Sequence, residues 1–371
     1  MRPTRALVDL AAVARNVRAL RALTAPPVRQ MAVVKADAYG HGAVPVARAA
    51  LGAGAEWLGV ALVEEGVDLR RAGLGAPILV LGAAFPEEAA EAVGNGLRVA
   101  VCGRETPLAL DRAAAAQGRT ALVHVKVDTG MGRLGVSPAE AVAYVEWLGG
   151  LPHLRVEGLF SHFAAADEAD LSFSRAQLAA FRRLVQALEA RRRRPPLCHM
   201  ANTAAVIALP ESHLDLVRTG IGIYGLHPSP ETPRAATLEP VMSLVTRIAH
   251  LKDVPAGTPL SYGRTFVARR PSRIATLPVG YGDGYPRLLS NRGRVLVGGH
   301  CVPLVGRVCM DLVLADATDV PGARTGDQAV LFGRQGNAAI GAEDLARLVD
   351  TIHYEITCNV GKRVPREYVG G

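Results

Sequence analysis

The sequence lacks the short motifs that usually mark metal sites and dinucleotide sites. Its five cysteines are scattered with no C-x-x-C pair, and neither an H-E-x-x-H motif nor a Cys/His cluster suggests zinc. We therefore expect no metal, and reduced thiols of the kind found in cytosolic proteins. No G-x-G-x-x-G follows the first predicted strand, which disfavours a doubly wound dinucleotide-binding sheet.

Long apolar runs and aromatic residues are also scarce. No run approaches the length of a membrane span, and the N-terminus enters an amphipathic segment and not a signal sequence. Hydrophobic residues make up 49% of the chain and charged residues 20%, which is typical of a globular protein. We therefore predict a cytoplasmic protein with no membrane partner.

The charge balance is basic, with a formal net charge of +8. The densest basic run, Arg191 to Arg194, precedes two prolines and ends a long helical pattern, where cations suit the helix dipole. Because no aromatic interleaving or nucleic-acid motif accompanies this run, we predict no nucleic-acid partner. The positive charge could instead gather small anions.

The pattern of predicted secondary structure divides the 371 residues into two parts. In residues 1–230, helical patterns separate eight apolar strand candidates, which favours a (β/α)₈ TIM-type barrel over an open doubly wound sheet. These candidates are Met31–Lys35, Trp57–Ala61, Ile78–Leu81, Leu97–Val101, Ala121–Asp128, Val156–His162, Leu197–Asn202 and Leu214–Arg218. A proline-rich linker then leads to short alternating runs with many glycine and proline turns, which predict a mainly antiparallel β domain over residues 231–371.

Polar residues end five of the predicted barrel strands, namely Lys35, Asp128, His162, Asn202 and Arg218. The C-terminal ends of barrel strands form one face, and active sites lie there, so these residues predict a shared pocket. A desolvated lysine loses charge and becomes a nucleophile toward aldehydes. Lys35 could instead form a purely structural ion pair with Asp37.

Anion-binding groups accompany this lysine. Arg133 lies between glycines, where its guanidinium can meet an anion bidentately, and Thr203, Gly220 and Ile221 follow strands seven and eight, where barrels often bind phosphate. An amine together with a phosphate anchor suits pyridoxal 5′-phosphate (PLP). Lys126 lies on the fifth strand, where it could form a structural ion pair with Asp128.

The sequence resembles the alanine racemases over nearly its whole length. The resemblance rests on ordered motifs, which are AVVKADAYGHG from Ala32, KVDTGMGRLG from Lys126, SHFA from Ser161, HMANTAA from His199, VRTGI from Val217, LSYG from Leu260, VCMD from Val308, YEITC from Tyr354 and RVPR from Arg363. It implies a PLP-binding barrel, a C-terminal β domain that contributes to the partner subunit's active site, and a homodimer acting on alanine.

The resemblance also implies a role for each matching residue. The cofactor would be held by Lys35, Tyr39, Arg133, His162, Asn202, Thr203, Arg218, Gly220, Ile221 and Tyr354. Arg133 and Met310 would bind the substrate carboxylate, and Lys126 resembles a lysine that is often carbamylated. Thr203 stands where the family commonly has serine, and Leu312 where a polar residue is common.

The implied reaction is racemisation of L- and D-alanine, which supplies D-alanine for peptidoglycan. Lys35 and Tyr262 would be the two bases on opposite faces of the substrate. From the residues alone, Tyr262 could instead be a turn tyrosine and Met310 a core residue. Arg218 favours a racemase over a decarboxylase, because an arginine does not easily protonate the pyridine nitrogen. Three rival functions remain, namely a broad-specificity or serine racemase of the same fold, a PLP-dependent amino-acid decarboxylase and a non-catalytic PLP-binding protein.

Overall fold

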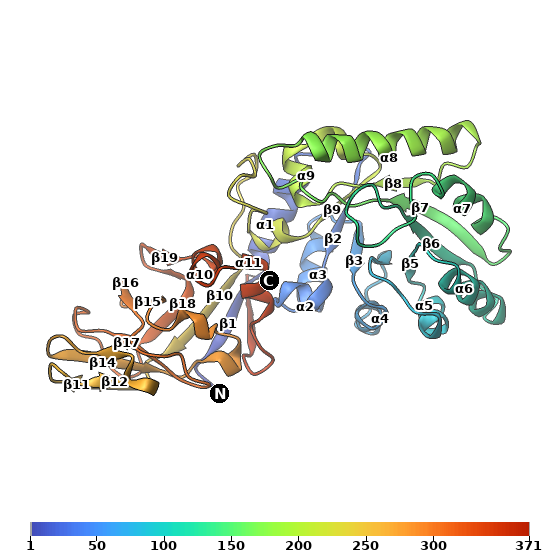
Figure 1. Cartoon of the computed structure of the whole chain (residues 1–371). Helices are drawn as coiled ribbons and strands as arrows, with labels where there is room; N and C mark the ends of the chain where they lie inside the picture. Colours follow the sequence, from blue (N-terminus) through green and yellow to red (C-terminus); the bar gives the residue numbers. More distant parts are fainter. Residues whose placement is uncertain (1, 371) are drawn as a thin grey trace. The chain divides into compact units, whose positions relative to one another are not determined.

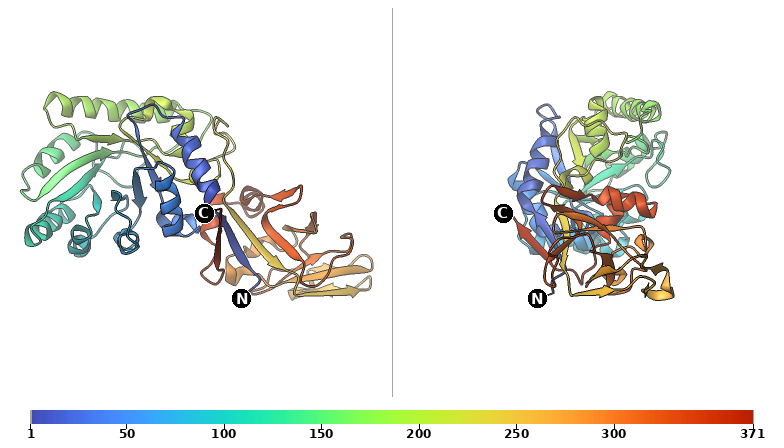
Figure 2. Two further views of the ribbon diagram at one scale, coloured as in Figure 1. Left: turned by 180° about the vertical axis from the view of Figure 1, so that it is seen from behind. Right: turned by 90° about the vertical axis from the view of Figure 1, so that its left-hand side faces the viewer.

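The computed structural model describes residues 2–370, which fall into two compact units (Figures 1 and 2). The barrel unit contains residues 12–38 and 43–239, and the β unit contains residues 2–11, 39–42 and 240–370. This division differs from the predicted boundary between residues 230 and 231. The linker groups with the barrel, whereas the first strand and the short segment 39–42 group with the β unit.

Eight parallel strands form a nearly closed barrel and confirm the predicted fold class. In spatial order they are β8 (Leu197–His199), β7 (Leu154–Phe160), β6 (Ala121–Lys126), β5 (Arg98–Val101), β4 (Ile78–Val80), β3 (Trp57–Val60), β2 (Arg29–Val33) and β9 (Leu216–Thr219). Backbone hydrogen bonds from Asp215 N to Cys198 O (3.1 Å) and from Arg218 N to Ala201 O (2.9 Å) link the two end strands.

Helices alternate with these strands along the chain, as the sequence pattern predicts. They are α1 (Leu10–Arg21), α2 (Lys35–Tyr39), α3 (Ala43–Gly52), α4 (Val63–Arg71), α5 (Ala89–Gly94), α6 (Glu105–Ala116), α7 (Ala141–Leu148), α8 (Ser172–Ala190) and α9 (Thr203–Ala208). Apolar side chains from five different strands pack against one another, namely Met31, Trp57, Leu79, Leu197 and Leu216. The barrel is therefore filled by side chains, as is usual for this architecture.

The β unit is built on a seven-stranded, mainly antiparallel sheet, as predicted. Its strands are β16 (His300–Pro303), β15 (Arg294–Val297), β18 (Gln328–Gln335), β10 (Met242–Arg247), β1 (Arg5–Asp9) and β20 (Arg366–Val369), with β19 (Ala338–Ile340) paired to β18. Strand β1 runs antiparallel to β10 and parallel to β20, so the two ends of the chain meet in one sheet.

Two smaller sheets and two helices complete the β unit. The sheets are formed by β11 (His250–Val254), β14 (Ser272–Leu277) and β17 (Val313–Asp316), and by β12 (Pro259–Leu260) and β13 (Phe266–Val267). The helices are α10 (Ala342–Val349) and α11 (His353–Cys358). Within residues 2–370, no helix combines the length and the apolar character that a membrane crossing needs.

Candidate active site

Lys35 lies two residues beyond the end of strand β2, on the C-terminal side of that barrel strand. Val33 and Val34 are buried, whereas Lys35 itself is half-buried. The predicted ion-pair partner of this lysine, Asp37, accepts a hydrogen bond from the Ala43 backbone N–H at 2.8 Å. Asp37 therefore closes the loop after the strand.

The backbone immediately after Lys35 is left-handed. Four consecutive non-glycine residues, Ala36 to Tyr39, have φ angles between 51° and 54°. This conformation costs roughly 1–2 kcal/mol for each L-residue, so surrounding contacts must hold it. One such contact is the hydrogen bond from the Ala36 N–H to the Glu65 carboxylate, at 2.6 Å. Strain of this kind concentrates at functional sites.

Lys126 ends strand β6 and is 8% exposed. Burial lowers the pKa of its amine to about 8, and the nearby charges of Arg218 and Arg133 act in the same direction. The amine lies 5.4 Å from the centre of the Phe160 ring and borders a cavity of about 340 Å³ that Cys102 and Leu134 also line. With this lowered pKa, about a tenth of the amine is neutral at pH 7, far more than for an exposed lysine.

Asp128 does not pair with Lys126. Its Oδ1 atom accepts hydrogen bonds from the N–H groups of Gly130 (2.9 Å) and Gly132 (3.1 Å). These bonds outweigh the effect of partial burial and lower the pKa of the carboxyl group. Asp128 thus shapes the turn that presents the exposed side chain of Arg133, and the interpretation of Lys126 and Asp128 as a structural ion pair is wrong.

Arg218 lies inside the barrel and is 4% exposed. The two N–H groups of its Nη2 atom are shared among three acceptors, which are the carbonyl oxygens of Ser161 and Met200, both at 2.9 Å, and His162 Nδ1 at 3.1 Å. Its Nη1 group donates to His199 Nδ1 at 2.8 Å. Burial lowers the pKa of this guanidinium to about 9, so it remains mostly protonated at neutral pH.

Four cationic residues of the predicted site lower the pKa of a fifth, His162. The pKa of His162 lies well below its usual value because the ring is buried and because Arg218, Arg133, Lys126 and Lys35 carry positive charge nearby. His162 is therefore neutral and accepts the Arg218 hydrogen bond. The C-terminal end of the barrel is a cationic site, which suits an anionic ligand.

The segments that follow strands β8 and β9 are joined by the hydroxyl of Thr203. Thr203 is 3% exposed, and its Oγ1 accepts the N–H of Gly220 at 2.9 Å. Asn202 caps helix α9 by accepting the Ala205 N–H at 3.0 Å. Because the Thr203 oxygen already accepts one hydrogen bond, its own proton can be donated to an anion. Ile221 follows as the first residue of a 3₁₀ helix, Ile221–Tyr224.

Two predicted cofactor residues pair within the β unit. The rings of Tyr39 and Tyr354 lie 6.0 Å apart and are tilted by 46°. Tyr39 is buried, which raises the pKa of its phenol, and the neighbouring Cys358 acts in the same direction. Gly40 packs so closely on helix α11 that an added Cβ would lie 2.2 Å from the Thr357 carbonyl oxygen. Glycine at this position thus allows Tyr39 and Tyr354 to approach each other.

Tyr262 and Met310 are exposed within the β unit, at 72% and 52%. Tyr262 opens a short 3₁₀ helix that follows Ser261, whose hydroxyl is fixed between the N–H and the carbonyl oxygen of Arg307. Tyr281 is also exposed, and its N–H donates to Cys309 O at 3.0 Å, so it adjoins Met310. Sequence reasoning missed Tyr281, although the YGDGY repeat of tyrosine and glycine was available as a signal. The exposure of Met310 shows that its interpretation as a core residue is wrong, whereas the exposure of Tyr262 in a short 3₁₀ helix is compatible with a turn tyrosine as well as with a functional one.

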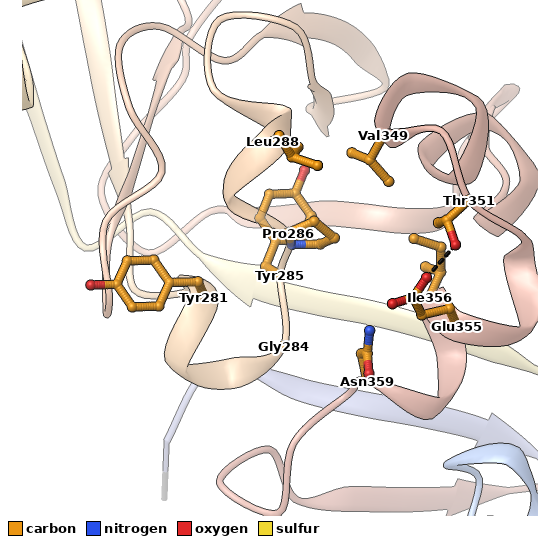
Figure 3. Close-up of a pocket in the computed structure, with 10 residues that line it drawn as sticks. All are labelled: Tyr281, Gly284, Tyr285, Pro286, Leu288, Val349, Thr351, Glu355, Ile356 and Asn359. Carbon is orange, nitrogen blue, oxygen red and sulfur yellow. Dashed lines mark hydrogen bonds between the residues drawn. The ribbon is translucent and has the colours of Figure 1, made fainter.

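The β unit also contains a cavity of about 380 Å³, shown in Figure 3. Its wall includes Tyr285, Leu288 and Ile356, and its polar groups include Glu355, which accepts a hydrogen bond from the Thr351 hydroxyl. None of the predicted site residues lines this cavity.

Sequence reasoning missed one group of buried polar residues behind Arg218. They are His199, His124 and Glu157, on strands β8, β6 and β7. The available signal was a histidine within a parallel strand that should be apolar on both faces.

Comparison with known proteins gives one consistent result. The family model described as "Alanine racemase, N-terminal domain" matches residues 8–228, and "Alanine racemase, C-terminal domain" matches residues 241–368. The chain is 48% identical to the alanine racemase of Halothermothrix orenii, with 100% of this chain and 98% of that protein covered. It is 50% identical to the alanine racemase of Symbiobacterium thermophilum, over 100% and 98% of the two chains. The crystal structure of alanine racemase from Streptomyces lavendulae superposes with a TM-score of 0.95 at 43% identity, covering 100% of this chain and 98% of that one.

Proposed function

The chain belongs to the alanine racemase family, and from this premise we propose that it interconverts L- and D-alanine with PLP as its cofactor. The observation that carries the proposal is the cationic site formed by Lys35, Lys126, Arg133 and Arg218 around the neutral ring of His162. A phosphorylated, aldehyde-bearing cofactor requires an accessible amine together with donors for its anionic groups, and this site supplies both.

The residues present fit the chemistry of this cofactor. Lys35 would hold its aldehyde carbon, and the Thr203 hydroxyl, whose oxygen already accepts the Gly220 N–H, would donate to its phosphate. Tyr39, Asn202, Gly220, Ile221 and Tyr354 would complete the phosphate end. When bound, PLP withdraws electrons from the substrate α-carbon and so makes its proton acidic.

Two bases on opposite faces of the α-carbon would then move the proton. We assign the first role to the Lys35 amine and the second to the Tyr262 phenol of the other subunit in a homodimer. The 72% exposure of Tyr262 supports this assignment, because a side chain that serves a partner's site must project from its own subunit. Exposed Tyr281, Met310 and Leu312 also support dimer formation, because apolar surface of this kind is typical of an interface.

Arg218 favours racemisation over decarboxylation. Three of its five N–H groups are occupied by two carbonyl oxygens and two histidines, and no ion pair within residues 2–370 includes it. Its remaining N–H groups can donate to the pyridine nitrogen but cannot easily protonate it. The cofactor is thereby a weaker electron sink, which suits reversible proton transfer.

Substrate orientation would depend on two further groups. Arg133 would contact the ring oxygen of the cofactor and the substrate carboxylate, and the Met310 backbone N–H of the other subunit would bind the same carboxylate. The lowered pKa of Lys126 supports carbamylation, because only a neutral amine reacts with carbon dioxide. A carbamate would replace a cation facing Arg133 with an anion.

We further propose that the D-alanine supplies peptidoglycan synthesis in the cytoplasm. The five cysteines are scattered along the sequence with no C-x-x-C pair, which supports a reducing compartment.

The direct test incubates the purified holoenzyme with L-alanine in deuterated water. Incorporation of α-deuterium together with formation of the D enantiomer is expected, and Lys35→Ala should abolish both. Release of carbon dioxide would establish a decarboxylase instead, and comparable turnover of serine or lysine would establish a broader racemase. Absence of PLP absorbance, with no borohydride fixation at position 35, would refute the proposal.

A further inference from the structure

A chain of buried polar side chains extends from the back of Arg218 across three strands. Arg218 Nη1 donates to His199 Nδ1 at 2.8 Å, and His199 Nε2 lies 2.9 Å from His124 Nδ1. His124 Nε2 then lies 3.4 Å from Glu157 Oε2, which also accepts Arg98 Nε at 3.1 Å. Both histidines are completely buried, whereas the Glu157 side chain at the far end of the chain is 15% exposed.

The protons along this chain can point in only one direction. A guanidinium has no acceptor and an ionised carboxylate has no donor, so both ends of the chain are fixed. His199 must therefore accept at Nδ1 and donate from Nε2, and His124 must do the same toward Glu157. Burial lowers the pKa of both rings, which keeps them neutral, while hydrogen bonding to His124 and Arg98 lowers the pKa of Glu157 despite its partial burial.

The local packing is built around these two rings. An added Cβ at Gly158 on β7 would lie 2.2 Å from His124 Nδ1, so only glycine leaves room for this imidazole. The register of β6 against β7 shifts at His124. The ring of His199 stacks on Phe160 with a centroid distance of 4.9 Å and an interplanar angle of 3°. These features hold each ring in the plane that the chain requires.

We propose that His199, His124 and Glu157 are positioning residues that orient Arg218 and balance its buried charge from behind. Among residues 2–370 no carboxylate pairs directly with Arg218, and a buried charge without compensation is costly. Two aligned imidazole dipoles connect the guanidinium of Arg218 to the negative charge of Glu157. The Nε–H and the second Nη1–H of Arg218 take no part in this chain. The inference rests on the proposed function, in which those N–H groups face the cofactor nitrogen.

A matched pair of substitutions separates this role from simple packing. Glutamine at position 199 can accept through Oε1 and donate through Nε2, which reproduces the direction of the chain, whereas leucine has a similar size and does neither. We expect His199→Gln to keep kcat within about threefold and His199→Leu to lose at least about tenfold. The pH profile of the PLP absorbance should shift in His199→Leu only.

Histidine ¹⁵N NMR of the full-length protein tests the chain without any reaction, with and without PLP. The wild type should show His124 and His199 as neutral rings protonated at Nε2, and Glu157→Gln should change His124 first. A ring protonated at Nδ1, or equal pH profiles for the two position-199 variants, would overturn the inference. If the expected tautomers were found in a protein that does not racemise alanine, the chain would stand and the proposed function would fail. Failure of His199→Leu to fold would leave the wild-type tautomers as the deciding measurement.

Discussion

The buried hydroxyl of Thr203 offers a quantitative test of the phosphate end of the site. Thr203→Val keeps the shape of the side chain but removes the acceptor for the Gly220 N–H, which is bound at 2.9 Å. A buried donor left without a partner costs about 1–3 kcal/mol of unfolding free energy. Thr203→Ser keeps the hydroxyl and removes a methyl group that packs beside Gly222, at a cost of about 1 kcal/mol.

The two substitutions should differ most in cofactor affinity. A hydrogen bond to a charged group contributes about 1.5–3 kcal/mol, so Thr203→Val should weaken PLP binding by roughly 10- to 100-fold. Thr203→Ser should bind PLP nearly as the wild type does. Urea unfolding of the apoenzyme gives the first quantity, and fluorescence titration of each apoenzyme with PLP gives the second. Equal PLP affinity for both variants would refute the role of the hydroxyl, whatever their stabilities.

Three further substitutions test other parts of the molecule. Tyr262→Phe should lower kcat at least about 100-fold in both directions, because it removes a proton-transfer group. Urea unfolding should show little change in stability, because the side chain is 72% exposed. Intact racemisation in both directions would exclude the two-base assignment. Folding lowers the pKa of Lys126 from 10.5 to about 8, so the folded state binds fewer protons than the unfolded state between these pH values, and stability should rise as pH increases through that range. Lys126→Met should remove this dependence and gain about 3 kcal/mol at pH 7, with the difference from the wild type disappearing near pH 10.5. A constant difference across a pH series of melts would contradict the lowered pKa. Tyr285 is 1% exposed, and its hydroxyl has no hydrogen-bond partner within residues 2–370. Tyr285→Phe should therefore be neutral or stabilise the protein by up to about 1 kcal/mol. A clear loss of stability in a thermal melt would indicate a bound water in the cavity of Figure 3.

The eight barrel strands can be predicted because each is a short apolar run separated by a helical pattern, and local periodicity carries that information. Strand β1 is missed for the opposite reason. Its partners, β10 and β20, lie more than two hundred residues further along the chain, and no local pattern in Arg5–Asp9 indicates them.

The site residues, like the strands, can be predicted only where a local pattern indicates them. Lys35, Lys126 and Arg218 stand out because polar side chains interrupt apolar strands. The partners of Arg218 do not stand out, because the contact between His124 and His199 depends on the stagger of three neighbouring strands and on the space left by Gly158. A buried histidine on one strand with a glycine on the next would be the pattern to search for.

The left-handed turn after Lys35 ties the amine of this residue to the path of the main chain. Four residues of reversed hand, from Ala36 to Tyr39, allow no insertion or deletion, since one added residue would rotate the lysine stem away from the barrel axis. Loop length elsewhere at the barrel rim can drift over evolutionary time, but the six residues between Lys35 and Gly42 should keep their number. We expect an engineered single-residue insertion in this segment to reduce activity more than many side-chain replacements in the same pocket.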